Sequence, residues 1–335
     1  MNPNELAPPA QLMNFIVGKW ISKPIYVAAE LGIADLLARG PKSIEALAQK
    51  SGSHAPSLYR VMRALASVGI FFETEGKQFE LTPMAEYLKT GEMKSIALLF
   101  NSDWSDNAWG YFLDSVRTGD TAFENAYGMP LSDWLEINPG AAEVFNRANA
   151  VKAANSHRVI VDAYDFSGIS TLTDVGGGVG ALMAEILIAN PLMEGVVAER
   201  PDVIREAEKL ISARGIADRC KATACDFFKE IPAGSDAYLM SNILHDWSDE
   251  QCRIILANCR KAMKENSKLL IVEMIIPPGN DPSIAKLLDL EMLVMTGGRE
   301  RTKKEFKTLL ESSGFKYSRT IAANQGVCVI EGIRV

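Results

Sequence analysis

The chain has 335 residues, of which 47% are hydrophobic and 23% charged, and its formal net charge at pH 7 is -7. This length favours two domains over one, and the negative charge argues against general electrostatic binding to nucleic acid or anionic membranes. The sequence contains no apolar run near the ~20 residues that cross a bilayer and no recognisable signal peptide, so we expect a cytoplasmic protein.

Residues 1–95 have the element order of a winged helix, which is three helices followed by a β-hairpin. The predicted elements are helices over residues 24–37, 43–50 and 56–69 and strands over residues 70–72 and 78–81. Pro56 stands at the first-turn position that proline favours. Gly76 lies in the predicted turn of the hairpin, and Thr82 can cap a further helix.

A winged helix is compatible with two functions, DNA binding and docking to a partner protein. Up to Lys94 the segment holds 10 basic and 9 acidic residues, and its third helix offers only Arg60 and Arg63. Because DNA recognition usually requires a basic face, we favour docking and predict no nucleic-acid partner.

Residues 96–165 are predicted to form an aromatic-rich helical connector that also contributes to an acceptor pocket. Nine aromatic residues lie between Phe100 and Phe145, and three of them are tryptophans: Trp104, Trp109 and Trp134. Such rings can pack between helices, or they can form the wall around a flat apolar ligand.

From residue 166 to residue 335 strands alternate with helices, which is the pattern of a doubly wound α/β domain. The predicted strands cover residues 171–175, 195–198, 220–224, 237–243 and 268–276, with a terminal pair near 316–320 and 326–332. Ligands of such domains bind outside the carboxyl ends of the parallel strands.

A glycine-rich loop, Asp174–Gly180, follows the first of these strands and opens a helix. Its glycines permit a tight turn and a close approach of a ligand to backbone amides, and Glu199 ends the next strand, where it can accept from ribose hydroxyls. Two cofactors fit. Gly176, Gly178 and Ala181 satisfy the dinucleotide pattern, and the aspartate followed by alternating glycines also fits the nucleoside loop of S-adenosylmethionine enzymes.

Two further features follow the third and fourth strands. Asp226 and Phe227 could bind the edge and the face of an adenine. His245 follows the fourth strand, and Ser248 and Gln251 can form a capping box that begins the next helix. His245 is therefore expected on the loop that faces the cofactor.

Few residues are available for metal binding. The five cysteines form no CxxC pair and are odd in number, which argues against a disulfide framework and against a zinc site. The three histidines, His54, His157 and His245, are widely separated. We predict that the protein holds no metal ion.

At this point the sequence resembles a known family, the S-adenosylmethionine-dependent O-methyltransferases of the caffeic-acid, acetylserotonin and bacterial antibiotic-tailoring type. The resemblance covers nearly the whole chain. It is carried by residues 29–33 (AELGI), 59–65 (YRVMRAL), 145–148 (FNRA), the glycine-rich loop, 245–247 (HDW) and 297–302 (GGRERT).

The resemblance implies a Rossmann-like, doubly wound methyltransferase domain at residues 166–335 and an N-terminal winged-helix domain used for homodimerisation. It implies metal-independent transfer of a methyl group to a small phenolic acceptor, with His245 as general base and with Glu273 and Glu300 beside it. The implied S-adenosylmethionine-binding residues are Asp174, Gly176, Gly178, Glu199, Asp226, Phe227, Met240 and Ser241. The implied acceptor-binding residues are Asn149, Phe145, Trp104, Asp246 and Met292.

Three positions depart from the family pattern: Glu199 replaces the usual Asp, Cys225 replaces Gly, and Asn149 replaces Met. The first two bear on cofactor affinity, and the third predicts a more polar acceptor pocket or an altered reaction. The alternative functions are decarboxylation, hydroxylation or a pericyclic step on the same fold, a nicotinamide-dependent oxidoreductase, and a ligand-sensing DNA-binding regulator.

Overall fold

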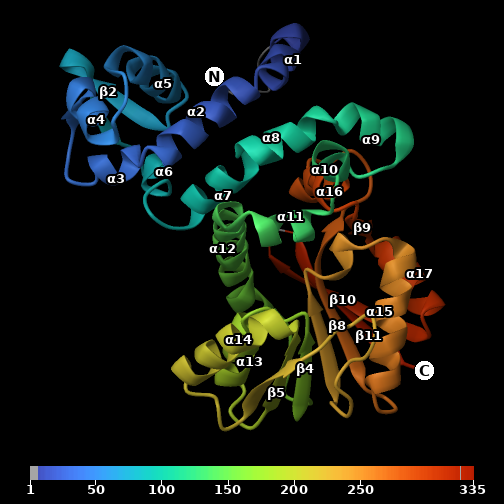
Figure 1. Ribbon diagram of the computed structural model, residues 1–335. Coiled ribbons are helices and arrows are strands. Elements are labelled where there is room, and N and C mark those ends of the chain that lie inside the picture. The colour runs from blue at the N-terminus through green and yellow to red at the C-terminus, as the bar shows by residue number, and fades with distance from the viewer. Residues whose placement is uncertain (1–6, 325) are drawn as a thin grey trace. The chain divides into compact units, whose positions relative to one another are not determined.

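The computed structural model describes residues 7–324 and 326–335, and the chain divides into two compact units (Figure 1). Unit 1 comprises residues 1–107 and 135–151, and unit 2 comprises residues 108–134 and 152–335. The expected connector, residues 96–165, therefore contributes to both units. The reason is that three helices, α8 (Asp103–Gly110), α11 (Leu131–Ile137) and α12 (Pro139–Ala163), each have residues in both.

Unit 1 contains the predicted winged helix. Its helices are α1 (Pro8–Ile16), α2 (Lys19–Glu30), α3 (Ile33–Leu37), α4 (Ile44–Ser51), α5 (Ala55–Ser67), α6 (Pro83–Glu86) and α7 (Glu92–Phe100), and its strands are β1 (Lys42–Ser43), β2 (Phe71–Thr74) and β3 (Gln78–Leu81). The strands form an antiparallel sheet in the order β1-β3-β2. Leu47, Met62 and Phe79 lie in its hydrophobic core.

Local sequence chemistry sets the ends of several of these elements. Ser43 accepts a hydrogen bond from the backbone N–H of Ala46 at 3.3 Å and begins α4, and Thr82 caps α6 in the same way, as predicted. The helix expected over residues 24–37 is instead two helices, because Gly32 adopts a left-handed conformation (φ +63°) between α2 and α3.

In unit 2 the aromatic residues that follow α8 pack against one another. They lie on or beside α9 (Phe112–Thr118), α10 (Ala122–Tyr127) and α11 (Leu131–Ile137). Phe123, which is fully buried, has its ring centroid 4.6 Å from that of Tyr127 and 5.6 Å from that of Trp134. The packing interpretation is confirmed for these rings.

A mixed sheet forms the centre of unit 2. Its main strands are β4 (Thr171–Val175), β5 (Glu194–Glu199), β6 (Cys220–Ala224), β7 (Ala237–Ser241), β8 (Lys268–Ile276), β10 (Phe315–Asn324) and β11 (Val327–Arg334), and a short strand, β9 (Arg301–Thr302), pairs with β8. The order is β10-β11-β8-β7-β4-β5-β6. Strands β4 to β8 run parallel, and β11 pairs antiparallel with β8 and β10. The predicted Rossmann-like architecture is confirmed.

Helices cover both faces of this sheet, as Figure 1 shows. Alternate residues of β8 point to opposite faces. Leu270 and Val272 pack in one core with α13 (Ala181–Ala189) and α14 (Pro201–Ala213). Leu269 and Ile271 pack in a second core with α15 (Asp249–Ala262) and α17 (Lys303–Ser312). Burial on both faces explains why this strand is a continuous apolar run in the sequence.

The strand order reverses between β4 and β7. From β4 the chain adds β5 and β6 on one side, and then β7 and β8 on the other. Ligands bind at such a switch point, outside the carboxyl ends of the strands. The loops that follow β4 and β7 carry the glycine-rich segment and His245 respectively, so the topology places both at this point.

Among the described residues, every helix falls short of the length and apolar character that a membrane-spanning helix requires.

Candidate active site

His245 lies in a short 3-10 turn, Leu244–Asp246, between the end of β7 and the start of α15. The strand ends two residues earlier than predicted, because Asn242 adopts a left-handed conformation (φ +53°) and redirects the chain. Ser248 and Gln251 form the predicted capping box, with hydrogen bonds of 3.1 and 3.3 Å. The turn is thus fixed between a strand end and a capped helix start.

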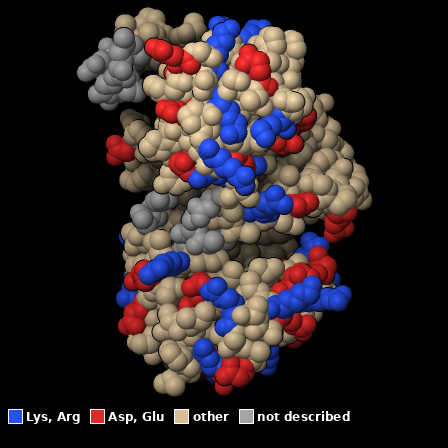
Figure 2. Space-filling view, turned by 90° about the vertical axis from the view of Figure 1, so that its left-hand side faces the viewer, with Lys and Arg blue, Asp and Glu red and all other residues tan. Residues whose placement is uncertain are grey.

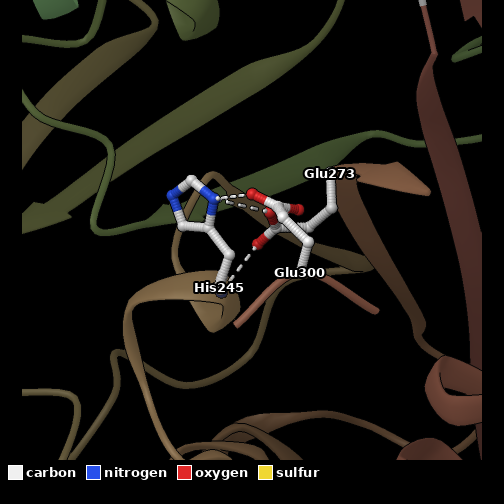
Figure 3. A group of neighbouring side chains, drawn as sticks. All are labelled: His245, Glu273 and Glu300. Atoms are coloured by element: carbon white, nitrogen blue, oxygen red, sulfur yellow. Dashed lines mark hydrogen bonds and ion pairs between the residues drawn. The ribbon is translucent and has the colours of Figure 1, made fainter. Parts of the chain in front are cut away.

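Two buried glutamates lie beside His245 (Figure 3). Its Nδ1 is 2.8 Å from Oε1 of Glu300 and 3.5 Å from Oε2 of Glu273. Glu273 belongs to β8, and Glu300 immediately precedes β9, which pairs with β8. The structure therefore brings the three residues predicted to be catalytic into one cluster, although 55 positions separate His245 from Glu300.

The carboxylates make His245 a stronger base than free histidine. Burial by itself lowers the pKa of His245, but the negative charges of Glu273, Asp246 and Glu300 outweigh it and raise that pKa to about 10. Burial also raises the pKa of Glu273 to about 7, against the opposing charge of His245. Within the described part of the chain, Oε2 of each glutamate has no hydrogen-bond partner, which favours a proton on the imidazole between them.

Because Nδ1 contacts the glutamates, Nε2 is the ring atom that faces away from them (Figure 3). Oδ1 of Asp246 is 3.8 Å from Nε2, and the histidine side chain is 14% exposed. A ring nitrogen that faces outward while carboxylates orient the other nitrogen is the arrangement of a general base.

The same cluster could also be a metal site. One ligand atom from each of its three residues lies within 4.8 Å of the others, a spacing that a metal ion could bridge. However, the contact between Nδ1 and Glu300 has the length of a hydrogen bond. Oε1 of Glu273 already accepts three backbone N–H groups. We therefore keep metal-independent chemistry as a prediction.

The glycine-rich loop after β4 needs its glycines for two physical reasons. Gly176, Gly178 and Gly180 have φ values of +70°, +56° and +80°, a region that side chains disfavour. In addition, a Cβ on Gly176 would lie 2.4 Å from Cδ1 of Ile243 and 3.6 Å from the ring of Phe227. The loop is therefore packed closely against residues that follow β6 and β7.

Two carboxylates border this loop. Asp174 is 1% exposed, its Oδ1 has no hydrogen-bond partner among the described residues, and burial together with the charge of Glu199 raises its pKa to about 7. Glu199 accepts the backbone N–H of Gly178 at 2.8 Å through Oε2 and that of Arg200 at 2.8 Å through Oε1. A buried acceptor without a donor is costly, so Asp174 would gain from a ligand that carries a hydroxyl or ammonium donor.

The residues predicted to bind adenine lie at the end of β6. Asp226 forms an ion pair with Lys229 at 2.8 Å, and the ring of Phe227 packs edge-on against Trp247 with centroids 6.1 Å apart. Phe227 also lies beside Gly176, as described above. The structure thus brings Phe227 to the glycine-rich loop, while the carboxylate of Asp226 is engaged at the surface.

Other predicted site residues of unit 2 lie on β7 and α16 (Ile284–Met295). Met240 is fully buried in the hydrophobic core, so only its backbone is available to a ligand. Ser241, the last residue of β7, is half-buried. Met292 is buried in α16, where the hydroxyl of Thr296 lies 3.9 Å from its sulfur.

Three predicted acceptor-binding residues belong to unit 1. Trp104 lies on α8, and Phe145 and Asn149 lie on α12, and all three side chains are half-buried. Their contact with an acceptor remains a prediction.

Cys225, one of the departures from the family pattern, follows β6. Its thiol donates to the carbonyl of Glu230 at 3.2 Å, and burial raises its pKa to about 11. At this position the cysteine side chain is a buried, unreactive thiol.

Sequence reasoning assigned no role to Gly298, Arg301 or Asp289. A Cβ on Gly298 would lie 2.0 Å from the carbonyl oxygen of His245. Arg301 is 1% exposed and hydrogen-bonded to the His245 turn. Oδ1 of Asp289 accepts the backbone N–H of Glu300 at 2.9 Å. Gly298 and Arg301 lie in the 297–302 motif that carries the family resemblance, but alternating charges such as those of residues 299–301 usually mark a solvated segment, and Asp289 had no such signal.

Comparison with known families identifies the chain. Residues 109–316 match the O-methyltransferase domain, and residues 13–91 match the O-methyltransferase dimerisation domain. The chain belongs to the O-methyltransferase family. It is therefore an enzyme that carries a dimerisation domain in unit 1 and a methyltransferase fold in unit 2.

Individual relatives agree with this family. The O-methyltransferase is 43% identical over 322 residues to the phenazine O-methyltransferase of Lysobacter antibioticus, covering 96% of this chain and 94% of that one. It is 38% identical over 326 residues to the mitomycin biosynthesis 6-O-methyltransferase of Streptomyces lavendulae, covering 96% and 93%. The solved structure of human N-acetylserotonin methyltransferase in complex with S-adenosylmethionine superimposes with a TM-score of 0.88 at 26% identity, covering 100% and 99%.

The cofactor of this O-methyltransferase is S-adenosylmethionine, as in its family. The residues at the switch point fit that molecule. The unpaired Oδ1 of Asp174 matches a donor on the cofactor, the bare backbone of the glycine-rich loop permits close contact, and Phe227 offers a ring beside that loop.

Proposed function

We propose that this O-methyltransferase methylates a phenolic hydroxyl of a small, planar, fused-ring aromatic such as a hydroxyphenazine, and that His245 is its general base. The observation that carries the base assignment is the hydrogen bond of 2.8 Å between Nδ1 of His245 and the buried Glu300. The acceptor class is supported by the relative that is 43% identical over nearly the whole chain, a phenazine O-methyltransferase.

The protein's own task in this reaction is to place and deprotonate the acceptor. S-adenosylmethionine supplies the methyl group on a sulfonium that is already activated for displacement. A phenol with a pKa of about 10 is a poor nucleophile while it is protonated. Since the glutamates raise the pKa of His245 to about 10, transfer of the phenolic proton to Nε2 is close to balanced, whereas an ordinary imidazole would accept it unfavourably.

The glutamates act through the imidazole. Glu300 holds Nδ1 in place, so that Nε2 keeps its outward direction. Glu273 adds negative charge on the same side and stabilises the imidazolium that forms as the proton arrives. Holding the acceptor oxygen in line with the methyl group supplies the remaining acceleration, by proximity and orientation.

An acceptor panel tests this function. Purified enzyme is incubated with S-[methyl-³H]adenosylmethionine and with hydroxyphenazines, hydroxynaphthoates, single-ring phenols and aromatic amines, each with and without EDTA. We expect tritium in the ether product of a fused-ring phenol, one S-adenosylhomocysteine per ether, and the same rate with EDTA. Transfer only to amines, or consumption of the aromatic substrate without S-adenosylhomocysteine, contradicts the proposal, and loss of activity with EDTA contradicts its metal-independent part.

We further propose that the enzyme is a homodimer that binds no nucleic acid. Helices α1 and α2 expose large apolar side chains within or beside the matched dimerisation segment, among them Phe15 (82% exposed) and Trp20 (74% exposed). Exposed apolar clusters of this kind are typical of protein interfaces. On the face that Figure 2 shows, basic and acidic side chains lie interspersed, whereas nucleic-acid binding requires a basic surface.

Replacing both Phe15 and Trp20 with Asp should convert the dimer to a monomer, because a subunit interface would have to bury four uncompensated charges per dimer. Multi-angle light scattering after size exclusion measures the mass. Leu192→Asp is the matched control, since Leu192 is 97% exposed and lies outside the dimerisation segment, and this variant should stay dimeric. A dimeric double variant would contradict the assignment of this interface.

A further inference from the structure

The turn that carries His245 is hydrogen-bonded through both its N–H and its C=O groups. On one side, the backbone N–H groups of Ile243, Leu244 and His245 all donate to Oε1 of Glu273, at 3.1, 2.9 and 3.3 Å. On the other side, the carbonyls of the turn accept from the chain segment that follows Gly298. The N–H groups thus converge on one carboxylate oxygen, and the carbonyls need an equally fixed donor.

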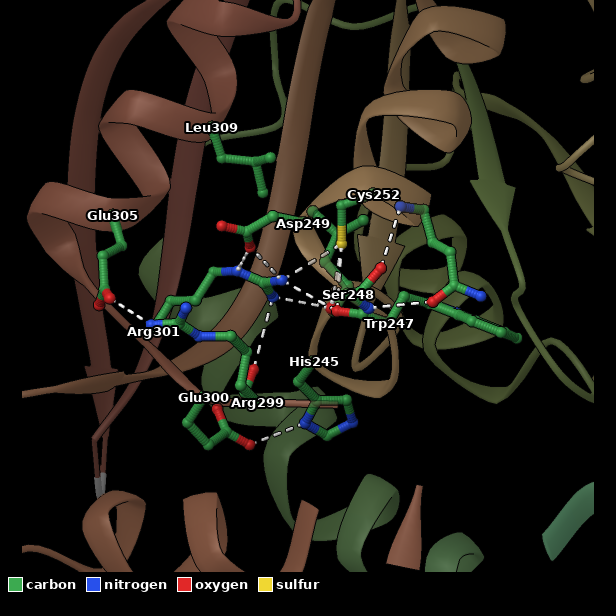
Figure 4. A network of polar contacts seen from close by, with 12 residues as sticks. His245, Trp247, Ser248, Asp249, Cys252, Arg299, Glu300, Arg301, Glu305 and Leu309 are labelled. Carbon is green, nitrogen blue, oxygen red and sulfur yellow. Dashed lines mark hydrogen bonds and ion pairs between the residues drawn. The ribbon is translucent and has the colours of Figure 1, made fainter. Parts of the chain in front are cut away.

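Arg301 supplies most of those donors (Figure 4). Its Nη1 donates to the carbonyl of Leu244 at 2.8 Å, and its Nη2 donates to the carbonyl of Trp247 at 2.9 Å. The carbonyl of His245 between them accepts the backbone N–H of Arg299 at 2.8 Å. One guanidinium therefore binds the carbonyls of Leu244 and Trp247, which lie on either side of His245 in the chain.

The guanidinium is itself anchored. Its Nε and Nη2 donate to Oδ1 of Asp249, in the first turn of α15, at 3.0 and 2.8 Å. The side chain is 1% exposed, while that of Asp249 is 43% exposed. A buried charge with several fixed hydrogen bonds is costly to place and rigid once placed. Such rigidity contributes to function if catalysis depends on the exact position of the His245 turn.

We propose that Arg301 is a positioning residue for methyl transfer, whose guanidinium fixes the His245 turn so that the imidazole meets Glu300 on one side and the acceptor hydroxyl on the other. The proposal rests on the proposed role of His245 as general base. Arg301 is the direct chain neighbour of Glu300, so one short segment places both the glutamate and the turn that carries its histidine partner. If the turn moves, the contact between Nδ1 and Oε1 and the direction of Nε2 change together.

The test compares Arg301→Lys with the parent enzyme. Lysine keeps the positive charge but loses the planar fork that reaches two carbonyls and Asp249 at once. We expect kcat to fall about 10- to 100-fold, the size of effect that a small misplacement of a reacting group produces, with the KM for S-adenosylmethionine unchanged. We also expect the acidic limb of the kcat/KM profile to move to lower pH, because a loosened turn weakens the contacts with Glu273 and Glu300 that raise the pKa of His245.

Arg260→Lys is the matched control, because Arg260 also binds a backbone carbonyl, that of Gly314 at 3.1 Å, away from His245. Replacing an arginine that has only a structural role lowers the melting temperature but does not change kcat or the pH profile. We expect this result for Arg260→Lys. A folded Arg301→Lys enzyme with parental kcat and a parental pH profile overturns the proposal.

If Arg301→Lys does not fold, Asp249→Ala decides the question, since it removes only the half-exposed anchor of the guanidinium. A drop in kcat with a shifted acidic limb supports the proposal, and parental values for both overturn it. His245→Gln is measured in the same assay. An active His245→Gln enzyme refutes the proposed base itself, whereas an inactive one beside a fully active Arg301→Lys enzyme refutes only the positioning role.

Discussion

Replacing His245 with glutamine should lower kcat for methyl transfer by about 10²- to 10⁴-fold, the contribution expected of a general base. Glutamine keeps a polar side chain that can still hydrogen-bond Glu300, but it accepts no proton from a phenol. Binding of S-adenosylmethionine, measured by isothermal titration calorimetry, should be unchanged, because the glycine-rich loop and Asp174 belong to β4 and its loop and not to the His245 turn.

The pH dependence provides the control for that experiment. In the parent enzyme the rate rises with pH as the His245 cluster loses its proton, since only neutral Nε2 can accept the phenolic proton. Without the base the rate depends on the fraction of phenolate, which grows until the pH reaches the phenol's own pKa of about 10. Because His245 and the phenol both have pKa values of about 10, the two rates should rise together below that pH, and the deficit of His245→Gln should stay about the same from pH 7 to pH 9. A variant with near-parental kcat at neutral pH would refute the assignment of the base.

Replacing Gly298 with alanine should lower kcat by about 10²-fold, because a displacement near 1 Å of a reacting group has that effect. The new Cβ would lie 2.0 Å from the carbonyl oxygen of His245 and 2.6 Å from the carbonyl carbon of Asp246. Both are backbone atoms, so neither can rotate away, and the His245 turn must shift. Steady-state kinetics with the best acceptor of the panel measures the effect.

Gly168→Ala is the matched control for this variant. A Cβ on Gly168 meets no atom within 4 Å, and its φ lies outside the left-handed region, so we expect parental kinetics. The Gly298→Ala variant should still bind S-adenosylmethionine. If it kept parental kcat, the close contact between Gly298 and the His245 turn would carry no catalytic consequence.

Local elements were predictable from the sequence to the extent that local physics decides them. Strand β8 was predicted with its observed bounds, because a continuous apolar run buried on both faces leaves little ambiguity. The caps at Thr82 and Ser248 were also predicted, since each depends on residues three positions apart. The errors are local as well: left-handed Gly32 divides a predicted helix, and left-handed Asn242 shortens a predicted strand.

The candidate site was predictable only in part. The motifs and the family resemblance indicated His245, Glu273 and Glu300. Nothing local indicated that Glu273 would bind the turn's N–H groups, or that Arg301 and Gly298 would pack against its carbonyls. By sequence pattern alone Arg301 belongs to a charged, exposed segment, whereas the structure buries it.

By itself the sequence determined the chain's chemistry and its local structure: the glycine-rich loop after a strand, the order of strands and helices, the family, and a single histidine after a strand end. The tertiary structure alone decided how those parts meet. Pairing of β7 with β8, and of β8 with β9, is what places His245 next to Glu273 and Glu300. The physical reason is how far apart in the sequence the interacting residues lie. Caps, turns and apolar periodicity are interactions between residues a few positions apart. The pKa of His245 is raised by its neighbour Asp246 and by two buried glutamates 28 and 55 positions away, and only the folded sheet brings those glutamates to the histidine.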